Sequence, residues 1–243
     1  MIRAVVFDVD NTLVDFRKWK NAAVDAAVVA MIDAGLDLTQ EQARRKIFAI
    51  YDEKGIEYQG VFDDFLHDVL GYIDHRILAA GIVAYRRARE GALVSYPHVN
   101  LALLRLFRMH LKLAVVSDAP RMQVWMRLVQ LGVDMFFDTV VTFDDTGVRK
   151  PAPEPFRKAL ELMQVQPAEA VMVGDWAERD IVGAKTLGMY TVFARYGDEF
   201  GTKVSGADFE VSDVLELIPI VEKLSGSASD HKGTRTPRAR KRK

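Results

Sequence analysis

Two kinds of hydrophobic pattern divide the chain. At its start and in its second half, short apolar runs such as residues 4–7 (AVVF) stop abruptly at polar residues, and helical patterns separate the runs. Between about Lys18 and Arg89, apolar residues recur only at helical spacing. Because strands buried in a parallel sheet are near-continuous apolar runs, the outer parts predict strands and helices in alternation. The inner part predicts helices alone.

The inner part divides into four helices at glycine stops and capping residues. Thr39 and Gln42 form a capping box that opens one helix, and Asp74 is placed to cap another. The apolar positions of these helices are expected to fill mostly a small core of their own. The economical arrangement is an all-helical cap, residues 17–93, inserted after the first strand with part of its surface over the strand ends. The expected helices are 21–33, 39–54, 61–70 and 74–89.

After Pro97 the alternation of strands and helices resumes. Strands and helices at this spacing predict the α/β class with a doubly wound parallel sheet. Right-handed crossovers then place the carboxyl ends of all strands on one edge. The core is expected to comprise residues 1–16 and 94–224. Its strands are expected at 2–8, 113–116, 139–142, 171–173, 191–194 and near Phe209, and its helices at 101–110, 122–131, 155–163, 180–187 and around Pro219.

The last part of the chain, residues 225–243, has neither pattern. It contains seven basic residues after His231 and no apolar period. A segment of this composition buries too little apolar surface to become ordered, so it predicts a disordered basic tail. We favour a solvated tail that aids solubility. The alternative is a tail that attracts an anionic partner, either nucleic acid or a membrane surface.

Composition restricts the class of protein, its chemistry and its partners. The 243 residues are 49% hydrophobic and 28% charged, as in globular proteins, and a net charge of -1 gives no overall attraction to nucleic acid. The absence of cysteine excludes disulfides, thiolate nucleophiles and cysteine metal sites. No apolar run approaches the ~20 residues that span a bilayer, and the amino terminus lacks a signal-peptide pattern. We therefore expect a cytoplasmic monomer or homodimer without a membrane partner.

Polar clusters follow the predicted strands and carry the candidate chemistry. Asp8 and Asp10 are two residues apart, so an extended backbone would point both carboxylates into one pocket. Because two carboxylates at one site repel each other, such a pair requires a cation. The alternative for this pair is two solvated aspartates in a turn. Further candidates are Thr12, Ser117 with Asp118, Lys150, and Asp175 with Asp180.

With these clusters in this order, the chain resembles the haloacid dehalogenase superfamily, in its large phosphatase branch. FDVDNT matches the first motif of that family, VVSD the second, RKPAPEPF the third and GDWAERDIVGAKTLGM the fourth. The resemblance covers roughly residues 1–224, and the helical insert is similar to the family's first-type cap. It implies a Rossmann-like core and a phosphoric monoester hydrolase that acts on a small-molecule phosphoester.

The resemblance also implies a role for each candidate residue. Asp8 would be the nucleophile and Asp10 the general acid and base. Mg²⁺ would be bound by the side chains of Asp8 and Asp175 and by the backbone carbonyl of Asp10. The phosphate would be held by Lys150, which is also catalytic, together with Ser117 and Asp118. Thr12 and Asp180 would contact the catalytic and metal-binding groups and hold them in position, without contacting the substrate.

Some of these roles have alternatives. Asp180 would hold Lys150 or a metal-bound water, or it would only be an acid at a helix N-terminus. Thr12 would orient its turn or only cap it. Asp118 stands where family members often carry a neutral residue, and Trp176 stands where small polar residues are usual. An acid at position 118 would point away or lower the affinity for phosphate.

Asp10 separates phosphatases from dehalogenases in this family. A 2-haloacid dehalogenase lacks this acid, because halide leaves without a proton and no metal is needed. Phosphomutase-type transfer uses the same residues as hydrolysis and stays open. A phospho-receiver module also carries acids, a hydroxyl and a lysine at strand ends, but it is about half this length and has no helical insert. The expected substrates, in order, are glyceraldehyde 3-phosphate, phosphoglycolate and acylneuraminate phosphate.

Overall fold

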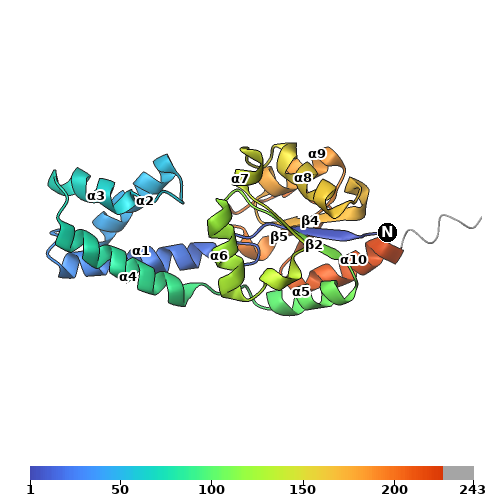
Figure 1. Cartoon of the computed structure of the whole chain (residues 1–243), viewed down its shortest axis with the longest axis horizontal. Helices are drawn as coiled ribbons and strands as arrows, with labels where there is room; N and C mark the ends of the chain where they lie inside the picture. The colour runs from blue at the N-terminus through green and yellow to red at the C-terminus, as the bar shows by residue number, and fades with distance from the viewer. Residues whose placement is uncertain (227–243) are drawn as a thin grey trace, which may run out of the picture. The chain divides into compact units, whose positions relative to one another are not determined.

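A computed structural model describes residues 1–226 (Figure 1). The expected basic tail lies outside the described residues, except for its first two, which end the last helix at Gly226. The chain forms two compact units. The core unit comprises Met1–Leu13, Pro97–Val124 and the residues from Val133 onward. The helical unit comprises Val14–Tyr96 and Trp125–Gly132.

A sheet of six parallel strands forms the centre of the core unit. Its order is β3-β2-β1-β4-β5-β6, so β1 lies in the middle, between β2 and β4. Phe7 at the end of β1 is in register with Val115 of β2 and Val173 of β4. The doubly wound parallel sheet is thereby confirmed. The strands are β1 (Ala4–Phe7), β2 (Lys112–Val116), β3 (Thr139–Val141), β4 (Ala170–Gly174), β5 (Tyr190–Ala194) and β6 (Phe209–Val211).

Helices cover both faces of this sheet (Figure 1). On one face, Ala4 and Val6 of β1 pack into a buried cluster with Phe156, Leu160 and Met163 of α8. Residues two apart on a strand point the same way, which explains why β1 is apolar throughout: its alternate residues face opposite layers. The layer with α8 (Pro153–Met163) also holds α9 (Val182–Leu187), and the other layer holds α5 (Val99–Arg108) and α10 (Leu217–Gly226).

The helical unit has its own buried core, formed by residues such as Met31, Ile47 and Phe65. The predicted capping box at Thr39 and Gln42 is present. Four helices lie wholly in this unit: α1 (Phe16–Asp33), α2 (Gln40–Lys54), α3 (Val61–Leu70) and α4 (His75–Ala92).

The first helix begins earlier than the sequence pattern predicts. We expected it at residue 21, but α1 starts at Phe16 because the Asp15 side chain accepts a hydrogen bond from the backbone N–H of Lys18 at 3.0 Å. An aspartate at this position stabilises the first turn by satisfying a free backbone donor. In the second cap, Asp74 accepts from the N–H groups of Arg76 and Ile77 and opens α4 as predicted.

Two short elements of the core unit differ from expectation. The stretch after β3, expected to be a loop, contains the single turn α7 (Phe143–Thr146), which Thr142 caps. The helix expected at 180–187 begins with a wider π-turn at Ala177–Ile181 and continues as α9. Elements this short contain too few positions to show a hydrophobic period. The remaining helix, α6 (Arg121–Leu131), contributes residues to both units.

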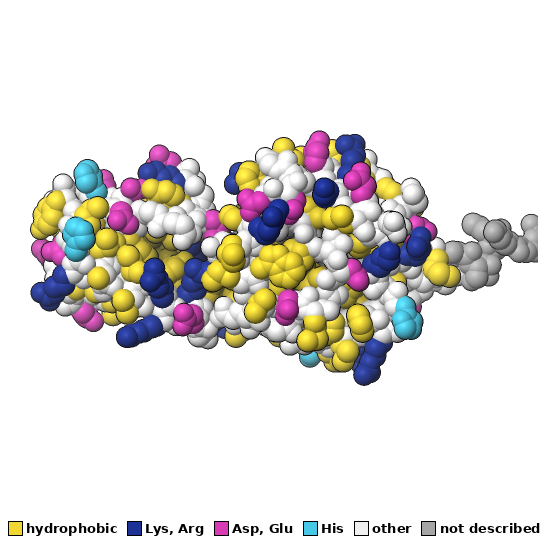
Figure 2. Space-filling view, in the orientation of Figure 1, with side chains coloured by type: hydrophobic (Ala, Val, Ile, Leu, Met, Phe, Trp, Pro, Cys, Tyr) yellow, Lys and Arg dark blue, Asp and Glu magenta, His cyan; other side chains and the backbone are white. Residues whose placement is uncertain are grey.

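The surface of the described residues carries both signs of charge. Figure 2 shows Lys and Arg side chains interspersed with Asp and Glu on the face in view. This mixture agrees with the formal net charge of -1. Among residues 1–226, no helix combines the length and the apolar character needed to cross a membrane.

Candidate active site

The predicted polar residues meet at the carboxyl ends of the three central strands. Asp8 follows β1, Asp175 follows β4, and Ser117 and Asp118 follow β2. Because β1 lies between the other two strands, this order brings residues that are far apart in the sequence to one edge of the sheet. Crevices outside the carboxyl ends of parallel strands are where ligands bind in open α/β sheets. Lys150 reaches the same edge from the loop before α8.

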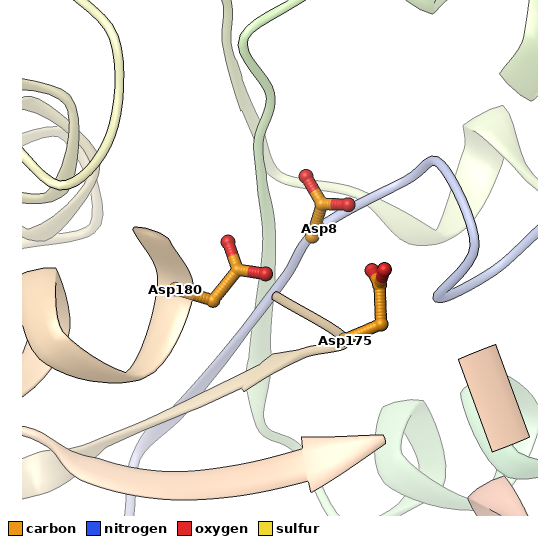
Figure 3. Close-up of side chains that lie close together, drawn as sticks. All are labelled: Asp8, Asp175 and Asp180. Carbon is orange, nitrogen blue, oxygen red and sulfur yellow. The ribbon is translucent and has the colours of Figure 1, made fainter. Parts of the chain in front are cut away.

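Three buried carboxylates form the centre of the site. Ligand oxygens of Asp8, Asp175 and Asp180 lie within 4.8 Å of one another. Figure 3 shows that the three side chains come from separate segments and face a common space. Their exposed fractions are 7%, 3% and 1%. Removing three carboxylates from water is unfavourable unless positive charge compensates them.

Lys150 supplies positive charge to this cluster. Its Nζ donates to Asp8 Oδ1 at 2.5 Å, to Asp180 Oδ1 at 2.6 Å and to the Val116 carbonyl at 3.1 Å. The side chain is itself buried. The Asp180 carboxylate therefore holds Lys150, and its other oxygen accepts from the backbone N–H of Trp176 at 3.0 Å.

Thr12 and Tyr196 connect the turn after β1 to this centre. Thr12 Oγ1 donates to Asp175 Oδ1 at 2.7 Å, so the threonine side chain contacts an acid of the site. The Tyr196 hydroxyl donates to the Thr12 carbonyl at 2.9 Å. Thr12 is completely buried. These two bonds fix the turn relative to β4 and to the segment that follows β5.

Ser117 and Asp118 contact different groups. The buried Ser117 Oγ accepts from the N–H of Ala119 at 3.2 Å. The carboxylate of Asp118 accepts from the backbone N–H of Lys150 at 2.8 Å and from Arg179 Nη1 at 3.0 Å. Asp118 is thereby engaged by Lys150 and Arg179, while Ser117 lies at the end of the strand beside the three acids.

Burial and mutual repulsion raise the pKa values of Asp8 and Asp175. Burial raises the pKa of Asp8 from 3.8 to about 7, with Asp180 and Asp10 adding to the rise and Lys150 opposing it. Burial also raises the pKa of Asp175 well above its usual range, and the charges of Asp8 and Asp180 raise it further. Asp10 is not part of the group of three acids, and its charge makes one of the smaller contributions to the rise in the pKa of Asp8.

The pKa of Lys150 is raised although the burial of the side chain alone would lower it. Burial lowers this pKa, but Asp180, Asp8 and Asp118 together raise it, so that it lies above its usual value. The ammonium therefore stays charged at neutral pH. Perturbed ionisable groups gathered at one place are typical of functional sites.

The donor set of the site fits a hard divalent cation. The three side chains that converge offer only carboxylate oxygens, which Mg²⁺ and Ca²⁺ prefer over nitrogen or sulfur. When all three acids are ionised, the single Lys150 ammonium does not compensate their charge in this buried space. A divalent cation would compensate the remaining charge, and this agrees with the sequence-based expectation.

Three further residues at the site were not singled out from the sequence. Arg179 pairs with Asp118, and Tyr196 holds Thr12. Gly197 is buried so closely that a Cβ on it would lie 1.7 Å from the Asn11 carbonyl oxygen and 3.0 Å from Asp175 Cβ. Each of these contacts joins distant parts of the chain. The only local signal was the position of Tyr196 and Gly197 just after a predicted strand.

Comparison with known proteins gives consistent matches. The family model described as haloacid dehalogenase-like hydrolase matches residues 2–188. A glyceraldehyde 3-phosphate phosphatase of Methanocaldococcus jannaschii is 37% identical over 227 residues, which cover 92% of this chain and 99% of that protein. One from Methanopyrus kandleri is 36% identical over 231 residues, with coverage of 93% and 99%. The crystal structure of a HAD phosphatase from Thermococcus onnurineus has a TM-score of 0.67 at 26% identity and covers 90% of this chain and 98% of that one.

The close approach at Gly197 predicts a loss of stability in Gly197→Ala. The added methyl group would collide with backbone of the turn after β1 and with Asp175, so one of them must shift. Overpacking of this kind lowers the free energy of unfolding by about 1–3 kcal/mol, measured by urea denaturation. Gly91→Ala is the matched control, because nothing lies within 4 Å of its Cβ position. Equal stability of the two variants would contradict the packing described here.

The raised pKa of Asp8 predicts how the stability of the metal-free protein depends on pH. A carboxyl with a pKa of about 7 in the folded state and 3.8 as its usual value stabilises the fold below pH 4, and this contribution is lost as the pH rises through about 7. In EDTA, the unfolding midpoint in urea should fall between pH 5 and pH 8. Asp8→Asn should reduce that fall, whereas the exposed Asp37→Asn should not. The same fall in Asp8→Asn as in the unmodified protein would refute the assignment.

Proposed function

The chain belongs to the haloacid dehalogenase-like hydrolase family and is a phosphatase of that family; from this premise we propose that it uses Mg²⁺ and an aspartyl-phosphate intermediate to hydrolyse a small phosphorylated metabolite. One observation carries the proposal. Asp8 stands at the end of the central strand with Lys150 on its carboxylate at 2.5 Å and Asp175 close beside it. A nucleophile, a cation for the phosphoryl oxygens and a second metal-binding acid are thus in one place.

Asp8 acts as the nucleophile in the first step. One carboxylate oxygen attacks phosphorus, and the bond between phosphorus and the ester oxygen breaks. Asp10, in its protonated form, donates its proton to the departing oxygen, so that the product leaves as a neutral alcohol. The reaction is thereby divided into two easier steps through a covalent intermediate on Asp8.

Asp10 acts as a base in the second step. Its carboxylate takes a proton from water while the water oxygen attacks phosphorus of the aspartyl-phosphate. The bond between phosphorus and the Asp8 oxygen breaks, which restores Asp8 and releases inorganic phosphate. Asp10 is protonated again and ready for the next substrate.

Lys150, Ser117 and the backbone after β2 hold the phosphoryl oxygens. Lys150 keeps its charge because the surrounding acids raise its pKa. The Ser117 hydroxyl oxygen accepts from the N–H of Ala119, and its own O–H is the donor assigned to a phosphoryl oxygen. The Asp118 carboxylate already accepts hydrogen bonds from Lys150 and Arg179. We therefore assign the phosphate contact of Asp118 to its backbone N–H and not to its side chain. Donors prearranged in this way stabilise the charge that develops on the transferring group.

Mg²⁺ would be held by the side chains of Asp8 and Asp175 and by the backbone carbonyl of Asp10. Thr12 orients Asp175 by donating to its carboxylate, and Asp180 orients Lys150. When bound, the cation supplies positive charge that reduces the repulsion between the Asp8 carboxylate and the phosphate dianion. The excess of buried carboxylates over ammonium groups supports this assignment.

Glyceraldehyde 3-phosphate is the substrate we propose first. Relatives that match this chain over more than nine tenths of its length, at 37% and 36% identity, are named for that activity. Phosphoglycolate hydrolysis and phosphomutase-type transfer use the same residues and are the alternatives. A 2-haloacid dehalogenase needs no acid at position 10, so Asp10 favours phosphoester hydrolysis over that alternative.

The nucleophile assignment predicts the behaviour of Asp8→Asn. An amide cannot form the aspartyl-phosphate, so hydrolysis of p-nitrophenyl phosphate in Mg²⁺ should fall by about 10³-fold or more. Circular dichroism should show that the fold is retained. Asp37→Asn, an exposed site on the helical unit, is the control and should keep full activity. Turnover by Asp8→Asn near that of the control would exclude Asp8 as the nucleophile.

The substrate assignment predicts a ranking of phosphorylated metabolites. Glyceraldehyde 3-phosphate should have the highest kcat/KM in a screen that also contains phosphoglycolate, sugar phosphates and acylneuraminate phosphate. Release of inorganic phosphate is the readout, with EDTA as the control that should abolish it. A higher kcat/KM for phosphoglycolate would overturn the choice of substrate, while phosphate release from any of these esters would still support the phosphatase.

A further inference from the structure

An acidic side chain stands immediately beside the proposed phosphate site. Asp118 follows Ser117, and both come directly after β2. A phosphate monoester is doubly negative near neutral pH, so an uncompensated carboxylate here would repel it. The structure must therefore compensate this charge if the site is to bind phosphate.

Arg179 provides that compensation. Its Nη1 lies 3.0 Å from Asp118 Oδ2, while Oδ1 accepts from the backbone N–H of Lys150 at 2.8 Å. The exposed fractions of the two side chains are 35% for Arg179 and 16% for Asp118, so the pair is partly shielded from water. Ion pairs in such positions are screened less by salt than pairs on the open surface.

Aromatic stacking fixes the position of the guanidinium group. Arg179 Cζ lies 3.7 Å from the centroid of the Trp176 ring. The Trp176 ring also packs against Phe200, with the two ring centroids 4.5 Å apart and the ring planes tilted by 38°. A guanidinium held over an aromatic face loses less rotamer freedom when it forms its ion pair. Arg179 is therefore prearranged opposite Asp118.

We propose that Arg179 is a positioning residue for phosphate binding: it neutralises Asp118 and holds it against the Lys150 backbone, so that this strand end presents donors to phosphate rather than a repelling charge. The inference rests on the proposed function, because it concerns the same phosphate site. Arg179 itself acts through Asp118. A purely structural ion pair would instead affect stability and leave the affinity for phosphate unchanged.

The test compares variants of the pair in the full-length protein with Mg²⁺. The readouts are KM and kcat for p-nitrophenyl phosphate and the inhibition constant of inorganic phosphate. Arg179→Gln should raise KM and the inhibition constant by about fivefold, with kcat changed by less than about twofold, because it leaves Asp118 uncompensated. Arg179→Lys keeps the charge and should recover most of this loss. Arg108→Gln removes an exposed arginine of α5 and should change neither constant.

The substitution Asp118→Asn should change the affinity for phosphate in the opposite direction to Arg179→Gln. Asp118→Asn keeps an oxygen acceptor for the Lys150 N–H but removes the negative charge, so inorganic phosphate should inhibit more tightly, by about threefold. The double variant Asp118→Asn with Arg179→Gln should bind phosphate more tightly than Arg179→Gln alone. Non-additivity of this kind measures the interaction between the two side chains directly. Higher ionic strength should weaken the effect of Arg179→Gln.

Several outcomes would overturn the inference. They are an unchanged inhibition constant in Arg179→Gln, a loss confined to kcat, or a double variant as weak as Arg179→Gln. If Arg179→Gln fails to fold, Arg179→Lys and the double variant carry the same comparison. Calorimetric binding of inorganic phosphate to each variant gives the same answer without turnover. If the unmodified protein hydrolyses no phosphoester but binds phosphate more tightly than Arg179→Gln does, only the proposed function fails. If the unmodified protein hydrolyses phosphoesters and all variants bind phosphate equally, only this inference fails.

Discussion

The site at the edge of the sheet is organised around acidic side chains that are buried together at one point. Asp8, Asp175 and Asp180 converge there with little exposure to water, and Lys150 is the ammonium that contacts two of them. Burial makes the ionised form of such acids unfavourable, which is why the pKa values of Asp8 and Asp175 rise. A fold selected for stability alone would not gather these groups. The proposed function accounts for this arrangement, because a divalent cation held by these acids would compensate their charge.

The sheet makes this concentration of charge possible. Strand order puts β1 between β2 and β4, and parallel direction puts all three carboxyl ends on one edge. The apolar residues of β1 are buried on both faces, so the strand is rigid up to the point where Asp8 begins the site. Chemistry that needs groups placed within fractions of an ångström gains from this rigidity. Thr12 and Tyr196 then extend the fixed geometry into the turn beyond the strand.

The sequence allowed prediction of the sheet and of the residues at its edge, but not of their supporting contacts. Asp8, Ser117 and Asp175 each follow an apolar run whose pattern is local, so both the strand and its end could be located. Contacts such as Tyr196 with Thr12 depend on distances across the fold, and no local pattern encodes them. The early start of α1 had a local cause, the cap at Asp15, which the alanine-rich period further along obscured.

The segment after β4 shows why local rules miss such contacts. In its π-turn, Ala177–Ile181, the N–H of Val182 bonds to the Ala177 carbonyl, so the turn is wider than an α-helical one. Arg179 and Asp180 are neighbours in sequence but serve opposite ends of Lys150: Asp180 accepts from its Nζ, and Arg179 holds the Asp118 that accepts from its backbone N–H. An α-helical pattern predicts neither contact. Single π-turns within α-helices are frequent at functional sites. One short turn therefore contacts the side chain of Lys150 directly and its backbone N–H through Asp118.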